Sequence, residues 1–324
     1  MSLKRKILIT VLLMIIAGII VTTIFIGLAV FDGSTQMTNP ETTSLASIES
    51  WLEANWDFDV DEFRSRYNIE NIMIESTSGD HEIPADYILA DGEQNNDTVI
   101  LVHGLGGNRI AVYPQARIFL ENGYNVLVYD QRSSGENLAE YNTFGYLESN
   151  DLRDYVNYIR EIIDDELEVG VWGNSFGGAT AGIYAGSEHA NQNLDFLILD
   201  SAISSKRDMV SQQLEQQFGP GFFRDYMLSV GNLFTRVRLG YTFEDVDVSN
   251  HTRNTEIPVM LIHSRADQLT PYYMAEDIYN SIQHDNKVIF SVEDSSHETV
   301  YWDNLIEYEI EVLNFIDEYS NRME

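Results

Sequence analysis

The stretch Gly173-Asn174-Ser175-Phe176-Gly177-Gly178 decides the fold of this chain. It follows the apolar run Glu168-Val169-Gly170-Val171-Trp172 and precedes small residues from Ala179 to Ala185. This order predicts a buried strand, a tight turn that carries a serine between two glycines, and then a helix. The glycines are needed because a side chain two positions from the serine would collide with the neighbouring strand or helix. The turn raises the hydroxyl above a sheet, so we predict that Ser175 is a nucleophile.

Strands alternate with amphipathic helices on both sides of this turn. Residues 72–74 and 83–89 predict an antiparallel opening pair of strands. Further strands are predicted at 98–102, 125–129, 168–172, 196–199, 258–262 and 288–292, with helices near 113–122 and 152–163 and others between them. Short apolar runs between helices are typical of a parallel sheet that is covered on both faces. We therefore predict an α/β fold with a doubly wound, mostly parallel sheet of about eight strands.

A serine nucleophile needs a base, and the base needs an acid that orients it. Among seven histidines, His297 is distinguished because it follows a strand and precedes the last amphipathic helix. Loops at the carboxyl ends of parallel strands are where such sheets gather their ligands and reactive groups. Asp267 follows the strand that ends at Ile262 and gives the chain order serine, aspartate, histidine. Asp200, at the end of the preceding strand, is the alternative acid.

Two backbone N–H groups are predicted to hold the oxyanion of a tetrahedral intermediate. One belongs to Phe176, the residue after the nucleophile. The other is that of Leu105 in the loop His103-Gly104-Leu105-Gly106-Gly107-Asn108, whose glycines let the backbone approach a substrate closely. The alternative for this loop is phosphate binding. It is disfavoured because the loop has neither the lysine and hydroxyl residue of a P-loop nor a G-x-G-x-x-G pattern.

These motifs, in this order over about residues 69–320, resemble those of the α/β-hydrolase superfamily. Within it, the chain is similar to bacterial serine hydrolases related to serine aminopeptidases, monoacylglycerol lipases and cinnamoyl-type esterases. The run from Asp130 to Gly135 also resembles a D-x-R-G-x-G turn of these proteins, with Ser133 in place of a glycine. Ser264 likewise stands where His-Gly often precedes the loop of the acid. The resemblance implies Ser175, Asp267 and His297 as a catalytic triad, and it implies no metal or organic cofactor.

The N-terminal region predicts a membrane segment. Lys4-Arg5-Lys6 precede an apolar run from Ile7 to Phe31, which is long enough to cross a bilayer as a helix. The basic flank is expected to stay in the cytoplasm, which places the rest of the chain outside as a single-pass membrane protein. The alternative is a signal peptide that is cleaved near Gly27-Leu28-Ala29 to give a secreted protein.

Two further segments complete the predicted organisation. Residues 32–68 are expected to be a spacer rich in Ser, Thr and Asn, followed by a short helix with Ile48, Trp51, Leu52 and Trp56 at helical spacing, which packs on the domain or contributes to a groove. Residues 69–324 form the predicted hydrolase domain. Within it, residues 203–255 are helical and strongly apolar and interrupt the strand–helix alternation, so they are predicted to be a lid.

Charge and composition exclude several classes of partner and chemistry. The chain has 52 acidic and 19 basic residues, a net charge of −33, which disfavours nucleic acid as a partner. It has no cysteine, which excludes disulfides, thiolate metal sites and a cysteine nucleophile.

The predicted function is a membrane-anchored, extracytoplasmic serine hydrolase that cleaves carboxylic esters. One alternative is a serine peptidase on the same triad, with Glu215 or Asp225 in the lid binding the free amine of a short peptide. The other is a non-catalytic surface protein that kept the fold.

Overall fold

The computed structural model describes residues 2–36, 38–79 and 81–319. The chain divides into two compact units, which we treat separately. One unit contains the chain up to Thr35 together with residues 207–245. The other contains residues 36–206 and the chain from Val246 onward. Most of the predicted lid is therefore grouped with the N-terminal apolar segment, although the two are far apart in the sequence.

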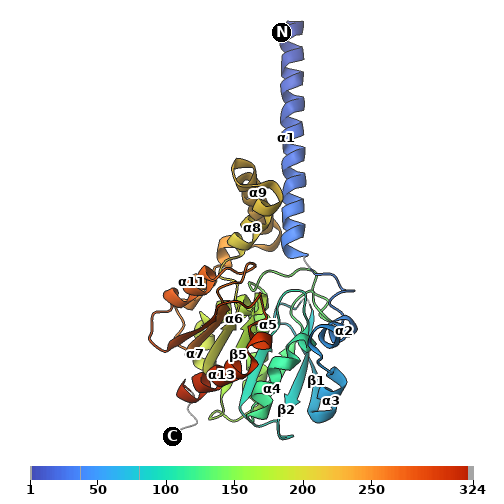
Figure 1. The fold of residues 1–324 in the computed structure, drawn as a ribbon. Coiled ribbons are helices and arrows are strands. Elements are labelled where there is room, and N and C mark those ends of the chain that lie inside the picture. The colour runs from blue at the N-terminus through green and yellow to red at the C-terminus, as the bar shows by residue number, and fades with distance from the viewer. Residues whose placement is uncertain (1, 37, 80, 320–324) are drawn as a thin grey trace. The chain divides into compact units, whose positions relative to one another are not determined.

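The larger unit is built on one eight-stranded sheet (Figure 1). The strands are β1 (Asn68–Glu75), β2 (Glu82–Leu89), β3 (Thr98–Val102), β4 (Asn125–Tyr129), β5 (Val169–Asn174), β6 (Phe196–Asp200), β7 (Val259–Ser264) and β8 (Lys287–Val292). Their order is β1-β2-β4-β3-β5-β6-β7-β8. β2 pairs antiparallel with both β1 and β4, and the remaining pairs are parallel. The predicted α/β fold, the number of strands and the antiparallel opening pair are confirmed.

Helices cover the sheet of this unit and bury its faces. They are α2 (Leu45–Trp56), α3 (Val60–Arg66), α4 (Tyr113–Glu121), α5 (Glu148–Ile162), α6 (Phe176–Ala185), α7 (Glu188–Asn193), α10 (Val248–Thr252), α11 (Tyr273–Ser281), α12 (Val300–Asp303) and α13 (Leu305–Tyr319), with a 3₁₀ turn at Arg109–Val112. Apolar residues of α2, α3, α4 and α13 form one buried cluster with Val99, Leu101, Val126 and Val128. Side chains alternate along a strand, so the intervening Ile100 and Leu127 face the other layer of helices.

The segment between the apolar helix and the sheet differs in part from its prediction. The first helix continues to Thr35, so the predicted spacer begins four residues later than expected. The predicted short helix is α2, which starts where the Ser44 side chain accepts a hydrogen bond from the N–H of Ser47. The side chains of Ile48 and Leu52 on the inner face of α2 are buried. The sequence did not predict α3, which is only seven residues long.

The smaller unit contains three helices and a 3₁₀ turn: α1 (Leu3–Thr35), α8 (Lys206–Phe218), α9 (Phe222–Leu239) and the turn Phe243–Asp245. Val30 of α1 packs with Val210, Leu214, Met227, Leu228 and Phe243. Among the helices of the described residues, α1 is the one that is long and apolar enough to cross a membrane, with a mean hydropathy of 2.9. Its first two-thirds, from Leu3 to Thr22, is exposed throughout.

Candidate active site

Ser175 lies on a tight turn between the end of β5 and the start of α6. Its backbone has φ 52° and ψ −114°, a left-handed conformation that a residue with a side chain rarely adopts. A Cβ on Gly173 would lie 2.5 Å from the carbonyl oxygen of Gly177, and one on Gly177 would lie 2.1 Å from that of Val102. Both positions therefore require glycine, for the steric reason that the sequence pattern indicated. The turn leaves Ser175 at the carboxyl edge of the sheet.

The structure brings the three predicted residues together. The Ser175 Oγ lies 2.8 Å from Nε2 of His297, in the loop between β8 and α12. The Nδ1 of the same ring lies 2.7 Å from Oδ2 of Asp267, in the loop between β7 and α11. Asp200, the alternative acid, instead accepts hydrogen bonds from the Tyr308 hydroxyl at 2.8 Å and the Ser201 hydroxyl at 2.9 Å. The histidine is therefore oriented by Asp267.

The electrostatics favour a charged aspartate beside this histidine. Burial raises the pKa of Asp267, but its hydrogen bond to His297, the charge of that ring and the groups of Thr270 outweigh burial and hold the pKa below its usual range. Burial lowers the pKa of His297, but the hydrogen bond to Asp267 and the charges of Glu298, Asp267 and Asp200 raise it overall. The site thus stabilises the imidazolium that forms when the ring accepts a proton.

Thr270 and Leu269 fix the carboxylate of Asp267, a role that was not predicted from the sequence. The N–H groups of Leu269 and Thr270 donate to Oδ1 at 2.8 and 2.9 Å. The Thr270 hydroxyl donates to Oδ2 at 2.8 Å. Bonds from an aspartate to N–H groups two and three residues later are a common local turn, so the spacing Asp-x-x-Thr contained a signal for it.

The loop predicted to hold the oxyanion is anchored by a neutral histidine. The N–H of Gln131 donates to Nε2 of His103 at 3.0 Å, so the ring proton is on Nδ1, which lies 2.7 Å from the carbonyl oxygen of Gly104. Burial lowers the pKa of His103 to about 4. Leu105 follows in this loop, and Phe176 is the first residue of α6, where an N–H has no partner within the helix. Their role as oxyanion donors stays a prediction.

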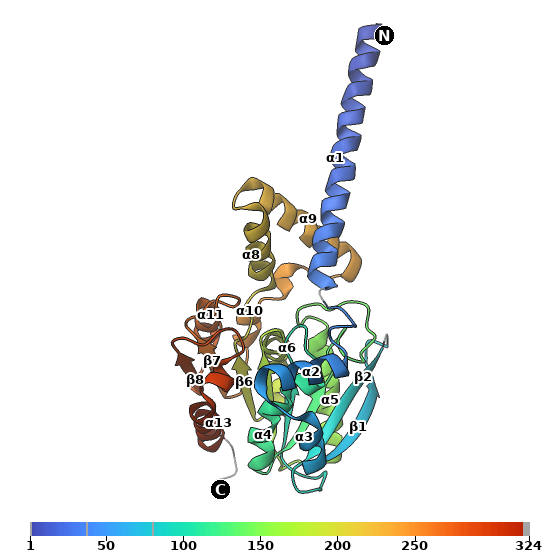
Figure 2. The same cartoon turned by 45° about the vertical axis from the view of Figure 1, so that its right-hand side comes forward.

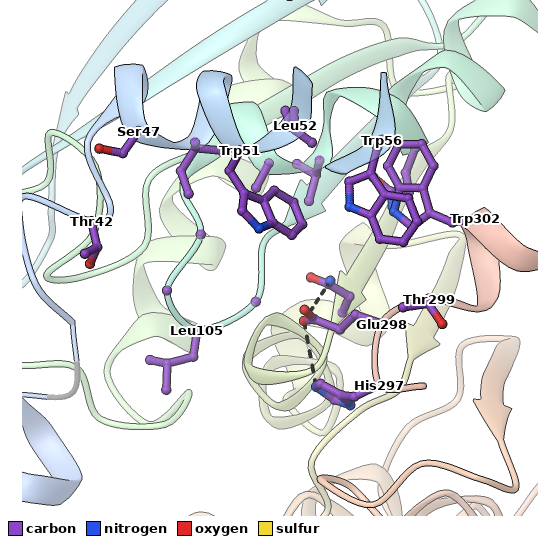
Figure 3. Close-up of a pocket in the computed structure, with 18 of the residues that line it drawn as sticks. Thr42, Ser47, Trp51, Leu52, Trp56, Leu105, His297, Glu298, Thr299 and Trp302 are labelled. Atoms are coloured by element: carbon purple, nitrogen blue, oxygen red, sulfur yellow. Dashed lines mark hydrogen bonds and ion pairs between the residues drawn. The ribbon is translucent and has the colours of Figure 1, made fainter. Parts of the chain in front are cut away.

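A cavity of about 660 Å³ opens beside His297 (Figure 3). Its apolar wall consists of Ile48, Trp51, Leu52, Trp56, Val112 and Trp302. The rings of Trp56 and Trp302 stack with centroids 4.5 Å apart and planes 4° from parallel. Since Ile48 and Leu52 also bury the inner face of α2, this helix both packs on the domain and lines a groove, the two alternatives that its sequence left open.

The carboxylate of Glu298 lies within this site, which was not predicted from the sequence. Asn174 donates from Nδ2 to its Oε1 at 3.0 Å, and the same oxygen lies 3.9 Å from Nε2 of His297. A Cβ on Gly104 would lie 2.2 Å from that oxygen. Burial raises the pKa of Glu298, and the charge of His297 partly offsets this. Its place next to His297 in the sequence was the available signal.

The described residues contain no group of three or more His, Cys, Asp or Glu side chains that are placed to hold a metal ion. The groups that the site brings together are a hydroxyl, an imidazole and carboxylates.

Comparison with known proteins agrees with this fold. A family model described as the alpha/beta hydrolase fold matches residues 97–240. The chain has the α/β-hydrolase fold. The uncharacterized protein YqkD of Bacillus subtilis is 27% identical over 228 residues, which cover 70% of this chain and 73% of that protein. The uncharacterized protein YfhR of Escherichia coli O157:H7 is 26% identical over 250 residues, 76% of each chain.

Solved structures share this fold. The esterase Pf2001 of Pyrococcus furiosus superposes with a TM-score of 0.64 and 22% identity, covering 81% of this chain and 95% of that one. The esterase EaEST of Exiguobacterium antarcticum gives a TM-score of 0.55 with 17% identity, covering 76% of this chain and all of the other, at 100%. At sequence identities of 22% and 17%, the similarity shows a shared fold.

Proposed function

We propose that this protein is a membrane-anchored serine hydrolase that cleaves carboxylic esters through an acyl-enzyme. The observation that carries the proposal is the hydrogen-bonded series Ser175, His297 and Asp267, with contacts of 2.8 and 2.7 Å. The two solved neighbours named above are esterases, which supports the same class of reaction.

In the proposed mechanism, His297 accepts the proton of the Ser175 hydroxyl as Oγ attacks the ester carbonyl carbon. The carbonyl oxygen becomes an oxyanion, which the N–H groups of Phe176 and Leu105 stabilise. The C–O bond to the alcohol then breaks, and Nε2 of His297 returns the proton to the leaving alkoxide. Water repeats both steps on the acyl-enzyme and releases the acid. Asp267 holds the His297 ring in the tautomer that carries its proton on Nδ1, so that Nε2 can accept the proton of Ser175.

The cavity supports a flat, largely apolar acyl group as the substrate. Its apolar wall includes the indole rings of Trp51, Trp56 and Trp302. Within the part of the chain that the structure describes, Nε1 of Trp56, Oε1 of Gln115 and Oδ1 of Asn174 are buried without a hydrogen-bond partner. Buried polar groups favour a ligand that satisfies them. We therefore expect an acyl group with a hydrogen-bonding substituent to be preferred over an unsubstituted chain of equal size.

The decisive test of the reaction is Ser175→Ala. The variant should lose hydrolysis of p-nitrophenyl esters and labelling by a fluorophosphonate probe, because both require Oγ as the nucleophile. Ser65→Ala, on an exposed face of α3 in the same unit, is the matched control and should retain both. Turnover by Ser175→Ala at the original rate would show that Ser175 is not the nucleophile.

The acyl site is tested by Trp51→Ala, since Trp51 lines the cavity and is 47% exposed. Loss of its contact should cost about 1–2 kcal/mol, on the order of tenfold in kcat/KM, for aromatic and long-chain esters. The acetyl ester, which has the shortest acyl group of the series, should be hydrolysed as by the unaltered protein. An equal loss for all chain lengths would contradict the assignment of this wall to the acyl group.

The membrane anchor in this proposal is α1. It is supported by an exposed apolar stretch behind the basic residues Lys4, Arg5 and Lys6. We expect the protein in the membrane fraction with its N-terminus intact and the hydrolase unit accessible to protease from outside. Mass spectrometry of the purified protein separates this from secretion after cleavage near Ala29, which would remove the helix.

A peptidase is the second candidate, and Glu298 favours it. A carboxylate in the cavity, 3.9 Å from Nε2 of His297, is placed to bind the free amine of a peptide. Glu215 and Asp225 are less suited, because both pair with Arg224, at 2.7 and 2.8 Å. Aminoacyl and peptide p-nitroanilides, assayed beside the esters, decide between the two. A protein that the fluorophosphonate probe does not label at all would instead be the non-catalytic alternative.

A further inference from the structure

The hairpin of α8 and α9 ends in an exposed aromatic tip. The two helices are joined by Gly219-Pro220-Gly221. Around this turn, Phe218 is 52% exposed, Phe222 is 85% exposed and Phe223 is 51% exposed. Single apolar residues are common on protein surfaces, but three large ones together mark a surface that meets an apolar partner.

The hairpin packs along the C-terminal third of α1. A Cβ on Gly27 would lie 2.3 Å from the Phe234 ring, and one on Gly231 would lie 2.2 Å from Val30, so glycines on both helices allow close contact. Small residues at such contacts are typical of helix pairs within membranes. The hairpin and the C-terminal third of α1 therefore lie side by side (Figure 2).

The direction of this packing sets the level of the tip. Thr23 of α1 is hydrogen-bonded through Oγ1 to the hydroxyl of Tyr226 near the start of α9. Further along both helices, the guanidinium of Arg238 lies 5.0 Å from the centroid of the Phe31 ring. The two helices therefore run in the same direction, and the tip of the hairpin is its end nearer the N-terminus of α1.

This level falls within the apolar run. A helix needs about 20 residues to cross the hydrocarbon, and 20 residues counted from Ile7 end at Ile26. Thr23 precedes that point, so Tyr226 lies at a depth that the hydrocarbon occupies. The ring of Phe222 stacks on that of Tyr226, with centroids 6.4 Å apart. The aromatic tip is therefore level with the part of α1 that would be in lipid.

The charges of α9 also suit a membrane surface. The helix carries Arg224, Arg236 and Arg238 against Asp225, a net charge of +2 in a chain whose total is −33. Arg236 and Arg238 are at its C-terminal end, level with Phe31, where a bilayer presents its headgroups. Arg224, near the tip, is paired with Glu215 at 2.7 Å and Asp225 at 2.8 Å. Basic residues at the rim and paired charges further in are what an interfacial element requires.

We propose that the hairpin is seated in the bilayer: Phe218, Phe222 and Phe223 insert into the hydrocarbon of the outer leaflet beside α1, and Arg236 and Arg238 meet lipid headgroups. The partner is lipid, and the anchor has two elements instead of one helix. This inference rests on the proposed anchoring by α1, which the same experiment measures separately.

The absence of cysteine from the chain allows the test on the full-length protein. Single cysteines at Phe222, Val237, Ile20 and Leu138, each an exposed position, are labelled with the fluorophore NBD. The labelled proteins are reconstituted into vesicles of phosphatidylethanolamine and phosphatidylglycerol that contain a quencher, either on the acyl chain or on the headgroup. Ile20 reports the anchor, Val237 the far end of α9, and Leu138 a position on the hydrolase unit.

We expect Phe222→Cys to show blue-shifted emission and quenching by the acyl-chain probe close to that of Ile20→Cys. Val237→Cys should respond more to the headgroup probe, and Leu138→Cys to neither. If Phe222→Cys behaves like Leu138→Cys while Ile20→Cys is quenched, the hairpin is outside the bilayer and the inference is wrong, although the anchor stands. Quenching at Phe222 without quenching at Ile20 would support the hairpin and overturn the anchor, and quenching at neither position would overturn both.

Discussion

Asp200 and Asp267 are two equally buried carboxylates whose pKa values are shifted in opposite directions. They lie at the carboxyl ends of the neighbouring strands β6 and β7, and each is 4% exposed. Burial raises the pKa of Asp200 to about 6, although Tyr308 and Ser201 donate to it. The pKa of Asp267 is instead below its usual range, because His297 and Thr270 outweigh burial. Position and burial are shared, so the hydrogen-bond donors and nearby charges decide how readily each carboxylate ionises, and Asp267 is the one that contacts Nδ1 of His297.

The largest expected effect in this comparison is that of Asp267→Asn. The amide cannot accept the proton of Nδ1 in the same way and favours the wrong tautomer of His297, so kcat should fall by about 10³–10⁴-fold. Steady-state kinetics on a p-nitrophenyl ester measure the loss. Asp200→Asn is the matched control, and its kcat should stay within about tenfold of the unaltered protein because Asp200 is hydrogen-bonded to Tyr308 and Ser201. The reverse ranking of the two variants would make Asp200 the orienting acid.

The second effect is on stability and concerns Asp200→Asn. Since the folded-state pKa of Asp200 is about 6, above its ordinary value of 3.8, the folded protein binds this proton more tightly than the unfolded chain. The ionised carboxylate therefore lowers the free energy of unfolding above pH 6, by up to about 3 kcal/mol, and this cost disappears as the pH falls towards 4. Asparagine has no such ionisation and loses about 1 kcal/mol of hydrogen bonding.

We thus expect Asp200→Asn to be the more stable protein at pH 8 and to lose this advantage at pH 4. Urea unfolding of both proteins at the two pH values measures the difference. A variant that is less stable by the same amount at both pH values would contradict a raised pKa for Asp200.

The pair Asp200 and Asp267 shows which features of the site can be predicted from the sequence. The sheet, the serine turn and the position of His297 follow from local patterns: apolar runs of strand length, glycines with no room for a side chain, and loops at strand ends. The choice of acid does not follow from such patterns, because Asp200 and Asp267 both end a strand. Only the distance of 2.7 Å between Asp267 and His297 separates them.

Features that depend on segments far apart in the chain could not be predicted. The stacking of Trp56 on Trp302 needs the placement of α2 against the end of the sheet. The packing of Gly231 on Val30 joins residues about two hundred positions apart, and neither segment contains a sequence pattern that identifies the other as its partner. Ser133 is a smaller surprise of another kind. It adopts φ 60°, a conformation that a residue with a side chain rarely takes, so the turn stores some backbone strain.

A third carboxylate, Glu298, extends the comparison and should give the smallest effect. Its charge helps to raise the pKa of His297, which must be neutral to accept the proton of Ser175. Activity is therefore lost as the pH falls through the pKa of His297. In Glu298→Gln the charge is removed while Oε1 can still accept from Asn174, so the pKa of His297 should fall.

The acid limb of the kcat/KM profile of Glu298→Gln should accordingly move to lower pH. Glu293→Gln is the control, because Glu293 is on the same loop but its side chain is 81% exposed and it pairs with Arg265 at 3.3 Å. Its limb should stay in place, since solvent screens an exposed charge. An unmoved limb in Glu298→Gln would mean that Glu298 is already protonated over the working range, as its own raised pKa allows at low pH. A limb that moved to higher pH would contradict the claim that the charge of Glu298 raises the pKa of His297.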